Sequence, residues 1–335
     1  MKAIVYSQHG LPINDPQSLY EAELPIPALG PHDLLVKIRA VAVNPVDTKV
    51  RAGSPTDTPR ILGWDAVGSV EAVGEAVSLF KRGDDVYYAG SITRQGAYAE
   101  YGVVDERIAG HKPASLTDAH AAALPLTSLT AWELLFDRLG VAENQGEGDS
   151  LLIIGAAGGV GSILTQLARQ LTKLRVIATA SRSDTAEWVK AMGANDVINH
   201  SRPLMSELRS IGLSQVRYVA SLTHTETHYP QIVEVLEPQG RLGIIDDPDV
   251  LDAVPLKLKA ISLHWELMFT RSMFSTYDLI RQHQILDRVR ALVDAGTLRT
   301  TLGEHFGTIN ATNLKRAHEL IESGKARGKI VLEGF

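Results

Sequence analysis

The sequence of 335 residues contains no cysteine. This absence excludes disulfides, cysteine nucleophiles, iron–sulfur clusters and thiolate zinc sites. Five like charges never occur in a row and the formal net charge is -6, so the basic face of a nucleic-acid-binding protein is missing. No apolar run approaches the roughly 18 residues of a membrane span, and residues 1–10 do not resemble a signal peptide. We therefore expect a cytoplasmic protein with neither a nucleic-acid nor a membrane partner.

The composition is that of a folded protein with about two domains. Hydrophobic residues make up 44% and charged residues 21% of the chain, which are ordinary values for globular proteins. A domain has about 150 residues. The first 125 residues contain short strand patterns separated by glycine and proline, which predict a β-barrel or sandwich. These strands are expected at 2–6, 34–43, 66–73 and 85–89.

From residue 150 onward, apolar strand patterns alternate with helical ones. This rhythm predicts an α/β domain with a doubly wound parallel sheet and right-handed crossovers. The strands are expected at 150–154, 174–180, 196–198, 218–222 and 241–246, with helices at 159–171 and 184–192. Two further helices, at 277–295 and 311–323, and a strand at 329–333 follow.

The first of these strands runs into a turn of small residues and then into a helix. That context is the one a dinucleotide-binding fingerprint requires. Side chains do not block the approach of a pyrophosphate to this backbone, and N–H groups at a helix start bind phosphate oxygens. The residues concerned are Ala157, Gly158, Gly159 and Val160. Because Ala156 stands where the fingerprint has its first glycine, a purely structural turn is the alternative.

The end of the second strand indicates which dinucleotide binds. NAD sites usually carry an acid there, which binds the ribose 2′-hydroxyl. Here the strand ends in Ala180 and is followed by Ser181 and Arg182. A hydroxyl and a guanidinium suit a 2′-phosphate, so we expect NADP(H). The first acid, Asp184, is expected to cap the next helix, and a solvated Ser-Arg loop is the alternative.

Cofactor contacts are also expected beyond the carboxyl ends of the later parallel strands. The residues placed there are His200, Thr223, His224 and Ile245. His224 and His228 are four apart and could share a helix face, but no third ligand is evident, so we predict no metal site.

Four segments together resemble the medium-chain dehydrogenase/reductase superfamily, on its quinone oxidoreductase side. They are Asn44–Thr48, Ile61–Gly68, Leu124–Trp132 and Ala156–Gly161. The subgroup that the chain resembles is the zinc-type alcohol dehydrogenase-like proteins. The resemblance implies a GroES-like catalytic domain at 1–125, completed by 297–335, and a Rossmann NADP-binding domain at 126–296. It also implies that the nicotinamide lies between the domains and that the protein is a homodimer.

The resemblance also assigns candidate site residues in the first domain. Zinc-dependent members carry a cysteine at the position of Asn44 and a histidine at that of Trp64, so we expect a zinc-free protein. The Asn44 amide would donate to a substrate oxygen, and Asp47 would orient this loop or a water. Trp64 would fill the vacated metal position or wall the substrate pocket. Turn residues at 44 and 47 are the alternative.

Four more residues are implied as cofactor contacts. Thr127 and Thr130 lie where the family approaches the nicotinamide, with helix capping as the alternative. Phe269 would lie near the nicotinamide, although 264–271 could instead be a packed strand or a dimer edge. Lys329 would reach the cofactor from the C-terminal segment.

The function implied is NADPH-dependent hydride transfer to a quinone or an α,β-unsaturated carbonyl, with a small molecule as substrate. Two alternatives stay open: a zinc-dependent alcohol dehydrogenase, and a non-catalytic NADPH-binding protein.

Overall fold

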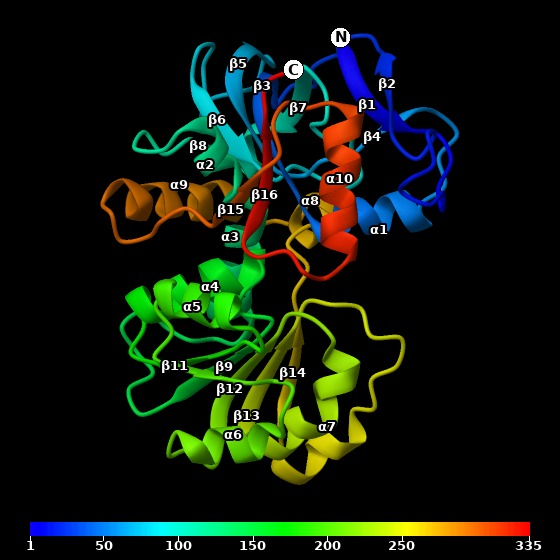
Figure 1. Ribbon diagram of the computed structural model, residues 1–335. Coiled ribbons are helices and arrows are strands. Elements are labelled where there is room, and N and C mark those ends of the chain that lie inside the picture. The colour runs from blue at the N-terminus through cyan, green and yellow to red at the C-terminus, as the bar shows by residue number, and fades with distance from the viewer. The chain divides into compact units, whose positions relative to one another are not determined.

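The computed structural model describes residues 1–335, which form two compact units (Figure 1). Unit 1 comprises Met1–Leu129 and Phe269–Phe335, and unit 2 comprises Thr130–Met268. Unit 1 is thus assembled from two separate stretches of chain. None of the helices combines the length and apolar character that a membrane crossing requires.

The second boundary lies earlier in the chain than the sequence suggests. Helix α9 (Arg281–Asp294), which we assigned by sequence to the Rossmann domain, belongs to unit 1. Its Leu286 carbonyl accepts a hydrogen bond from the Tyr87 hydroxyl at 2.6 Å, and its His283 ring lies 2.7 Å from the Ala109 carbonyl. These contacts between residues almost 200 positions apart could not be read from local patterns.

Unit 1 contains a seven-stranded and a three-stranded sheet. The larger sheet has the order β15-β16-β3-β5-β6-β8, with β7 also paired to β3, and the smaller has the order β2-β1-β4. The strands are β1 (Lys2–Tyr6), β2 (Tyr20–Glu23), β3 (Asp33–Val43), β4 (Arg60–Ile61), β5 (Ala66–Val73), β6 (Asp85–Tyr88), β7 (Tyr101–Asp105), β8 (Ala109–His111), β15 (Leu302–His305) and β16 (Lys329–Glu333).

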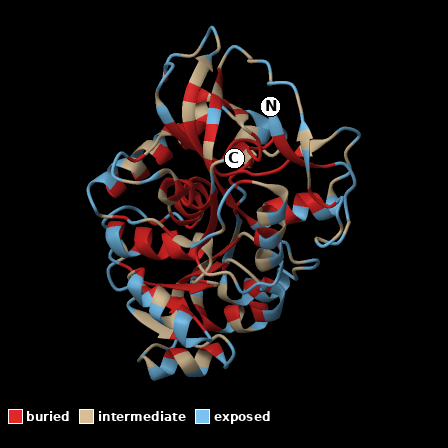
Figure 2. Ribbon diagram, turned by 45° about the horizontal axis from the view of Figure 1, so that its top comes forward, coloured by how far each residue is buried: buried red, intermediate tan, exposed pale blue.

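Strands β3 and β16 hold the two stretches of unit 1 together. They pair antiparallel, with Ile330 opposite Val43 and Leu332 opposite Val41. All four side chains are buried, and Figure 2 shows buried residues along both strands and interior helices. Burying one such side chain contributes about 1.5–3 kcal/mol. The C-terminal strand is therefore part of the core of unit 1.

The helices of unit 1 are short, apart from α9 and α10. They are α1 (Pro45–Gly53), η1 (Glu106–Ile108), α2 (Asp118–Ala122), α8 (Thr270–Phe274) and α10 (Ala311–Glu322). Helix α3 (Pro125–Trp132) carries the chain from unit 1 into unit 2 and continues as a π-helical turn, η2 (Glu133–Arg138). The irregular turn at η2 was not evident in the sequence, where 129–139 has an ordinary helical period.

Unit 2 is a doubly wound parallel sheet of the order β11-β10-β9-β12-β13-β14. Helices α4 and α5 cover one face and α6 and α7 the other (Figure 1). The strands are β9 (Ser150–Ile154), β10 (Arg175–Thr179), β11 (Asp196–Ile198), β12 (Val216–Ser221), β13 (Leu236–Ile244) and β14 (Ser262–Trp265); the helices are α4 (Gly159–Leu171), α5 (Ser183–Ala191), α6 (Leu204–Ser210), α7 (Thr225–Val235) and η3 (Val254–Lys259). The predicted combination of a β-rich unit, completed by the C-terminal segment, with a doubly wound α/β unit is confirmed.

Candidate functional site

A buried polar cluster in unit 1 gathers residues from four segments of the chain. Its centre is Asp65, which is fully buried just before β5. Asp65 Oδ2 accepts hydrogen bonds from Asn44 Nδ2 and from Lys329 Nζ, both at 2.9 Å, and Oδ1 accepts one from the Leu126 N–H at 2.8 Å. Burial raises the pKa of Asp65, whereas the Lys329 ammonium and the N–H donors act in the opposite direction. A buried carboxylate stays ionised only when a positive charge lies beside it, and here the Lys329 ammonium supplies that charge.

Lys329, the first residue of β16, directs its ammonium group into this cluster. Besides Asp65, Nζ donates to the Val43 carbonyl at 3.1 Å and to Asn44 Oδ1. An ammonium has three donors, and all three are used within unit 1. The Lys329 ammonium is thus bound within unit 1, and the cofactor contact expected from the sequence stays a prediction.

Asn44 is likewise bound within the protein. Its side chain accepts from Lys329 and donates to Asp65, with the Ala42 carbonyl 3.5 Å from Nδ2. The residue is only 1% exposed. The amide that we expected to donate to a substrate oxygen is thus already engaged, and Asn44 positions Lys329 and Asp65.

Asp47 lies in the first turn of α1 and is fully buried. Its Oδ2 accepts from the Asn44 N–H at 2.7 Å and from the Tyr98 hydroxyl at 3.0 Å. This geometry is that of an acid capping the start of a helix, which is the structural alternative for this residue. Oδ1 is buried without a hydrogen-bond partner. Burial raises the pKa of Asp47 to about 7, so this carboxyl takes up a proton near neutrality.

Trp64 fills the position where zinc-dependent relatives are expected to carry a histidine. Its side chain is buried, Nε1 donates to the Ser91 carbonyl at 3.0 Å, and the ring meets Phe269 edge to face at a centroid distance of 6.3 Å. Zinc in proteins is held by thiolates, imidazoles and carboxylates. At this position the chain offers an amide, an indole and a carboxylate that already binds an ammonium. These residues do not fit a zinc ion.

In unit 2, the turn between β9 and α4 exposes its backbone. Gly155 has a φ of +81°, and a Cβ on Gly161 would come within 2.5 Å of Ala156. Gly158 is the N-cap residue of α4. The residues of the turn that are partly exposed include Ala157, Gly158, Gly159 and Val160. The first N–H groups of a helix have no partner within it, so this turn fits a phosphate. The glycine at the start of the turn is Gly155, which our comparison with the fingerprint overlooked.

The residues expected to contact the cofactor's ribose follow adjacent strands. Ser181 and Arg182 are exposed after β10, and Arg182 Nε lies 3.2 Å from Asp184 Oδ1. The Ala180 N–H donates to the carbonyl of Ile198, the last residue of β11, at 2.9 Å. His200 follows β11 by two residues and therefore lies at the same edge of the sheet as Ser181. No acid occupies the end of β10, which is compatible with a 2′-phosphate.

Three more predicted residues follow the strands in the other half of this sheet. Thr223 and His224 lie after β12, with Thr223 Oγ1 2.8 Å from His224 Nδ1, and Ile245 lies after β13. His224 has a φ of 51°, a left-handed conformation that few residues adopt.

The remaining candidates, Thr127 and Thr130, are buried in α3. Thr127 Oγ1 donates to the Leu124 carbonyl at 3.2 Å. This bond to the preceding turn is a common way for threonine to satisfy its hydroxyl inside a helix. The hydroxyl proton of Thr127 is thus used inside the helix, and Thr127 does not cap a helix.

Sequence reasoning missed two buried acidic residues, one in each unit. Asp65 stands next to Trp64 in a segment that we singled out, but its carboxylate gave no local signal of its own. In unit 2, Glu266 is buried beside Glu133, and Arg138 Nε donates to Glu266 at 2.8 Å. Burial, followed by repulsion from Glu133, raises the pKa of Glu266 to about 9. Glu133 and Arg138 lie in the same turn, η2, but Glu266 is 128 residues beyond Arg138, so the pair could not be read from local patterns.

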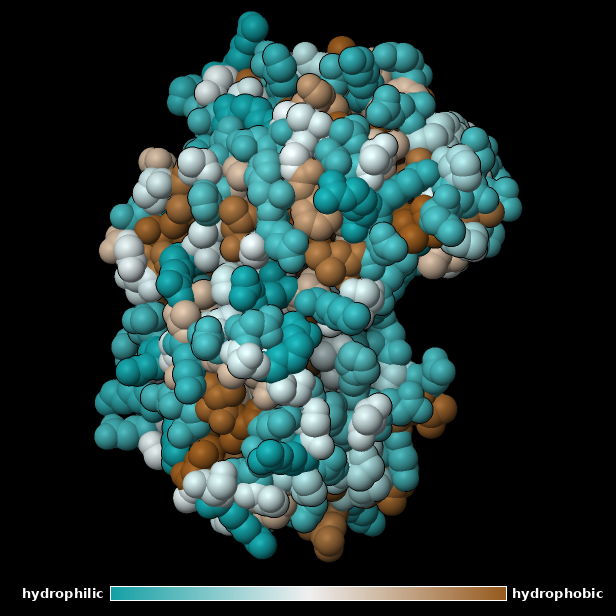
Figure 3. All heavy atoms as spheres, in the orientation of Figure 1, coloured by the Kyte–Doolittle hydropathy of each residue, from teal (hydrophilic) through white to brown (hydrophobic).

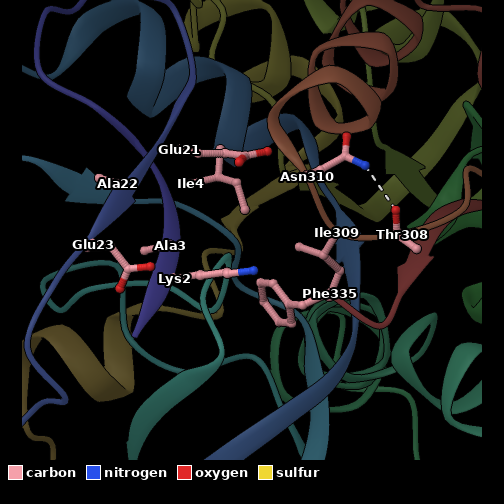
Figure 4. Close-up of a pocket in the computed structure, with 10 residues that line it drawn as sticks. All are labelled: Lys2, Ala3, Ile4, Glu21, Ala22, Glu23, Thr308, Ile309, Asn310 and Phe335. Carbon is pink, nitrogen blue, oxygen red and sulfur yellow. Dashed lines mark hydrogen bonds between the residues drawn. The ribbon is translucent and has the colours of Figure 1, made fainter.

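A surface pocket of about 380 Å³ lies elsewhere in unit 1, between β1, β2 and the C-terminal segment (Figure 4). Its walls combine Ile4, Ile309 and Phe335 with the charged side chains of Lys2 and Glu23. None of the candidate site residues lines it, and we assign it no function.

Two protein families match the chain. The profile described as "Alcohol dehydrogenase GroES-like domain" matches residues 30–114, and that described as "Zinc-binding dehydrogenase" matches residues 192–332. The zinc-type alcohol dehydrogenase-like protein SAS2087 of Staphylococcus aureus is 40% identical over 317 residues, covering 94% of each chain.

Solved structures match over the whole chain. A Rhizobium etli protein provisionally named a zinc-dependent alcohol dehydrogenase is 54% identical with a TM-score of 0.96, covering 100% of this chain and 98% of that one. Mycobacterial Rv1454c, solved with NADPH, is 28% identical with a TM-score of 0.84 and 99% coverage of both chains. The quinone oxidoreductase of Coxiella burnetii is 28% identical with a TM-score of 0.80, covering 100% and 99%.

Proposed function

The chain belongs to the medium-chain dehydrogenase/reductase superfamily of oxidoreductases, and from that premise we propose that it uses NADP(H) to reduce a quinone or an α,β-unsaturated carbonyl without zinc. The observation that carries the cofactor choice is the end of β10, where Ser181 and Arg182 stand in place of an acid. The NADPH complex of Rv1454c and the quinone oxidoreductase name of the Coxiella protein support the proposal.

The residues of unit 2 would bind and orient the cofactor. The N–H groups at the start of α4 face the pyrophosphate, and Arg182 and Ser181 bind the 2′-phosphate. When bound, NADPH supplies the hydride. Positioning of this kind accounts for a large part of catalysis in enzymes whose cofactor does the chemistry.

The residues of unit 1 would shape the substrate side without a metal. Asn44, Asp65 and Lys329 form a closed network that neutralises its own charge, and the buried rings of Trp64 and Phe269 pack against each other where a metal would otherwise lie. Asp47 holds a proton near neutral pH but is fully buried, so we assign it the capping of α1.

The second candidate, a zinc-dependent alcohol dehydrogenase, is suggested by the names of the Rhizobium and Staphylococcus proteins. The Lys329 ammonium on Asp65 argues against it, because a cation would have to displace a charge that the cluster already contains.

Binding measurements with two variants test the cofactor choice. Arg182→Ala should weaken NADPH binding by about 1.5–3 kcal/mol, the size of a hydrogen bond to a charged group, and leave NADH binding nearly unchanged. Arg209→Ala, on the exposed surface of α6, is the matched control. Equal losses for NADPH and NADH would refute the assignment.

Oxidation of NADPH in the presence of quinones, enones and aldehydes tests the reaction class. Turnover of quinones or enones that survives chelators supports the proposal, and aldehyde turnover that chelators abolish supports the zinc enzyme. Tight NADPH binding with no turnover of any substrate would instead indicate a non-catalytic NADPH-binding protein.

We also propose that two copies associate through β14, the edge strand of the unit 2 sheet. Trp265 and Leu267 at or beside this edge are 52% and 51% exposed. On the face shown in Figure 3, hydrophobic side chains are scattered in small groups. An open edge with apolar side chains favours pairing with another strand, and a two-fold axis would join the two sheets.

A further inference from the structure

Three histidines from two elements meet at the carboxyl edge of the unit 2 sheet. His200 follows β11, while His224 and His228 lie at the start of α7. The rings of His200 and His228 are nearly perpendicular, at 81°, with centroids 5.9 Å apart. His228 is 9% exposed and His200 is half-buried. The cluster has no role in the fold described above.

Both of these imidazoles have a buried nitrogen without a hydrogen-bond partner. The atoms are His200 Nδ1 and His228 Nδ1. A buried polar group without a partner costs free energy, so such groups are uncommon unless a ligand or a proton completes them. Burial, followed by the charge of neighbouring histidines, lowers the pKa of both rings. In the free protein they are therefore neutral at physiological pH.

The cluster lies next to the residues proposed to bind the cofactor's 2′-phosphate. Strands β10 and β11 are neighbours, with Thr179 opposite Ile198. Ser181 and His200 each follow their strand by two residues, so they occupy equivalent places at this edge. The cofactor's phosphate would thus bring negative charge to a ring that is neutral without it.

The other charged groups around the rings are already paired. Asp246 accepts from the Thr225 N–H and hydroxyl, Glu207 accepts from the Asn199 N–H and pairs with Arg202, and Arg182 pairs with Asp184. The free protein therefore holds no anion in direct contact with His200.

We propose that His200 takes up a proton when the 2′-phosphate of NADPH binds beside it, and that His228 is the positioning residue that fixes the His200 ring. This inference rests on the proposed use of NADPH. The phosphate is a dianion above its second pKa of about 6 and favours the charged form of an adjacent imidazole. NADH, which has no 2′-phosphate, would bind without this proton. The choice between the two cofactors would then depend on pH.

Isothermal titration calorimetry at about pH 7.5, in two buffers with different ionisation enthalpies, counts the protons taken up on binding. Binding of NADPH should be accompanied by the uptake of more protons than binding of NADH, and the difference should approach one proton per chain. Between about pH 7.5 and 8.5, where the phosphate stays a dianion, NADPH should weaken relative to NADH by up to ~10-fold, the limit for one linked proton.

Variants separate the two roles. His200→Gln should abolish the proton difference and keep NADH affinity, which also shows that the variant is folded. His228→Phe keeps an aromatic ring against His200 and should retain the difference, whereas His228→Ala should reduce it. His9→Gln, on the exposed surface of unit 1, is the matched control and should behave as the wild type.

The outcomes distinguish this inference from the proposed function. If the wild type prefers NADPH but takes up no more protons with it than with NADH, the inference is overturned and the proposed function stands. A wild type with no preference for NADPH overturns both. Loss of the proton difference in His9→Gln as well as in His200→Gln would show that the effect is not local and would also overturn the inference.

Discussion

Replacing Lys329 with methionine tests whether the buried cluster of unit 1 is held together by its ammonium. Methionine keeps the length and most of the packing of the side chain but removes three hydrogen bonds, to Val43, Asn44 and Asp65. Asp65 then remains as a buried carboxylate without a counter-charge. Breaking one partner of a buried ion pair costs about 3–5 kcal/mol.

Thermal unfolding measures this cost. At about 2–4 °C per kcal/mol for domains of 150–250 residues, Lys329→Met should lower the melting temperature by roughly 6–20 °C. Lys81→Met removes an exposed ion pair with Asp84 and is the control, since surface pairs contribute only about 0–1 kcal/mol.

A double variant shows whether the cost arises from the unpaired carboxylate. Lys329→Met combined with Asp65→Asn should be more stable than Lys329→Met alone, because no buried charge is left over. A loss in Lys329→Met no greater than that of Lys81→Met would refute the reasoning, particularly if NADPH affinity fell at the same time. That pair of results would return Lys329 to the cofactor contact expected from the sequence.

Three further predictions follow from the structure. The raised pKa of Glu266, about 9, means that the folded state keeps a proton that the unfolded state releases above about pH 4.5, so stability falls as pH rises between these values. Glu266→Gln keeps a neutral side chain and should lose less stability between pH 5 and 9 than the wild type; melting curves with an unchanged pH dependence would contradict this. Tyr98→Phe removes the hydroxyl that donates to Asp47 and should cost about 1–3 kcal/mol in denaturant unfolding, and a variant as stable as the wild type would disprove the contribution of this bond. Leu267→Pro beside β14 removes an N–H group that edge pairing would use, so light scattering should find monomer or aggregate, while a wild type that is itself monomeric at micromolar concentration would end the dimer proposal.

The sequence predicted those elements whose signal is local. The strand at 150–154, the glycine turn and the helix after it follow one another in a fixed pattern, so the start of the Rossmann sheet was evident. Helix α1 was missed because its sequence, Pro45–Gly53, lies between apolar strands and has few helix-favouring residues. Strand β2 was missed because none of its four residues is buried: they alternate between partly exposed and exposed positions, so its sequence, YEAE, lacks an apolar strand pattern.

The candidate site was predicted less completely, because its contacts connect distant parts of the chain. Asn44 and Lys329 are 285 residues apart and join through Asp65. Periodicity and spacing do not report contacts of that kind. The sequence identified the residues on either side of the cluster, but the network shows that their polar groups bind one another. For Ser181, Arg182 and His200, by contrast, the order of parallel strands was enough to place them at one edge of the sheet.

The pairing of β3 with β16 bears on how this chain folds during synthesis. Unit 2 is a single continuous stretch, so all of its strands are available once residue 268 has been made. Strand β3 is synthesised long before that point, but its neighbour β16 arrives only with residues 329–333. Contacts with such large sequence separation form late, and an unpaired strand edge is prone to aggregate while it waits. The nascent chain should therefore pass through a stage in which the Rossmann sheet is complete while β3 still exposes the edge that β16 will cover.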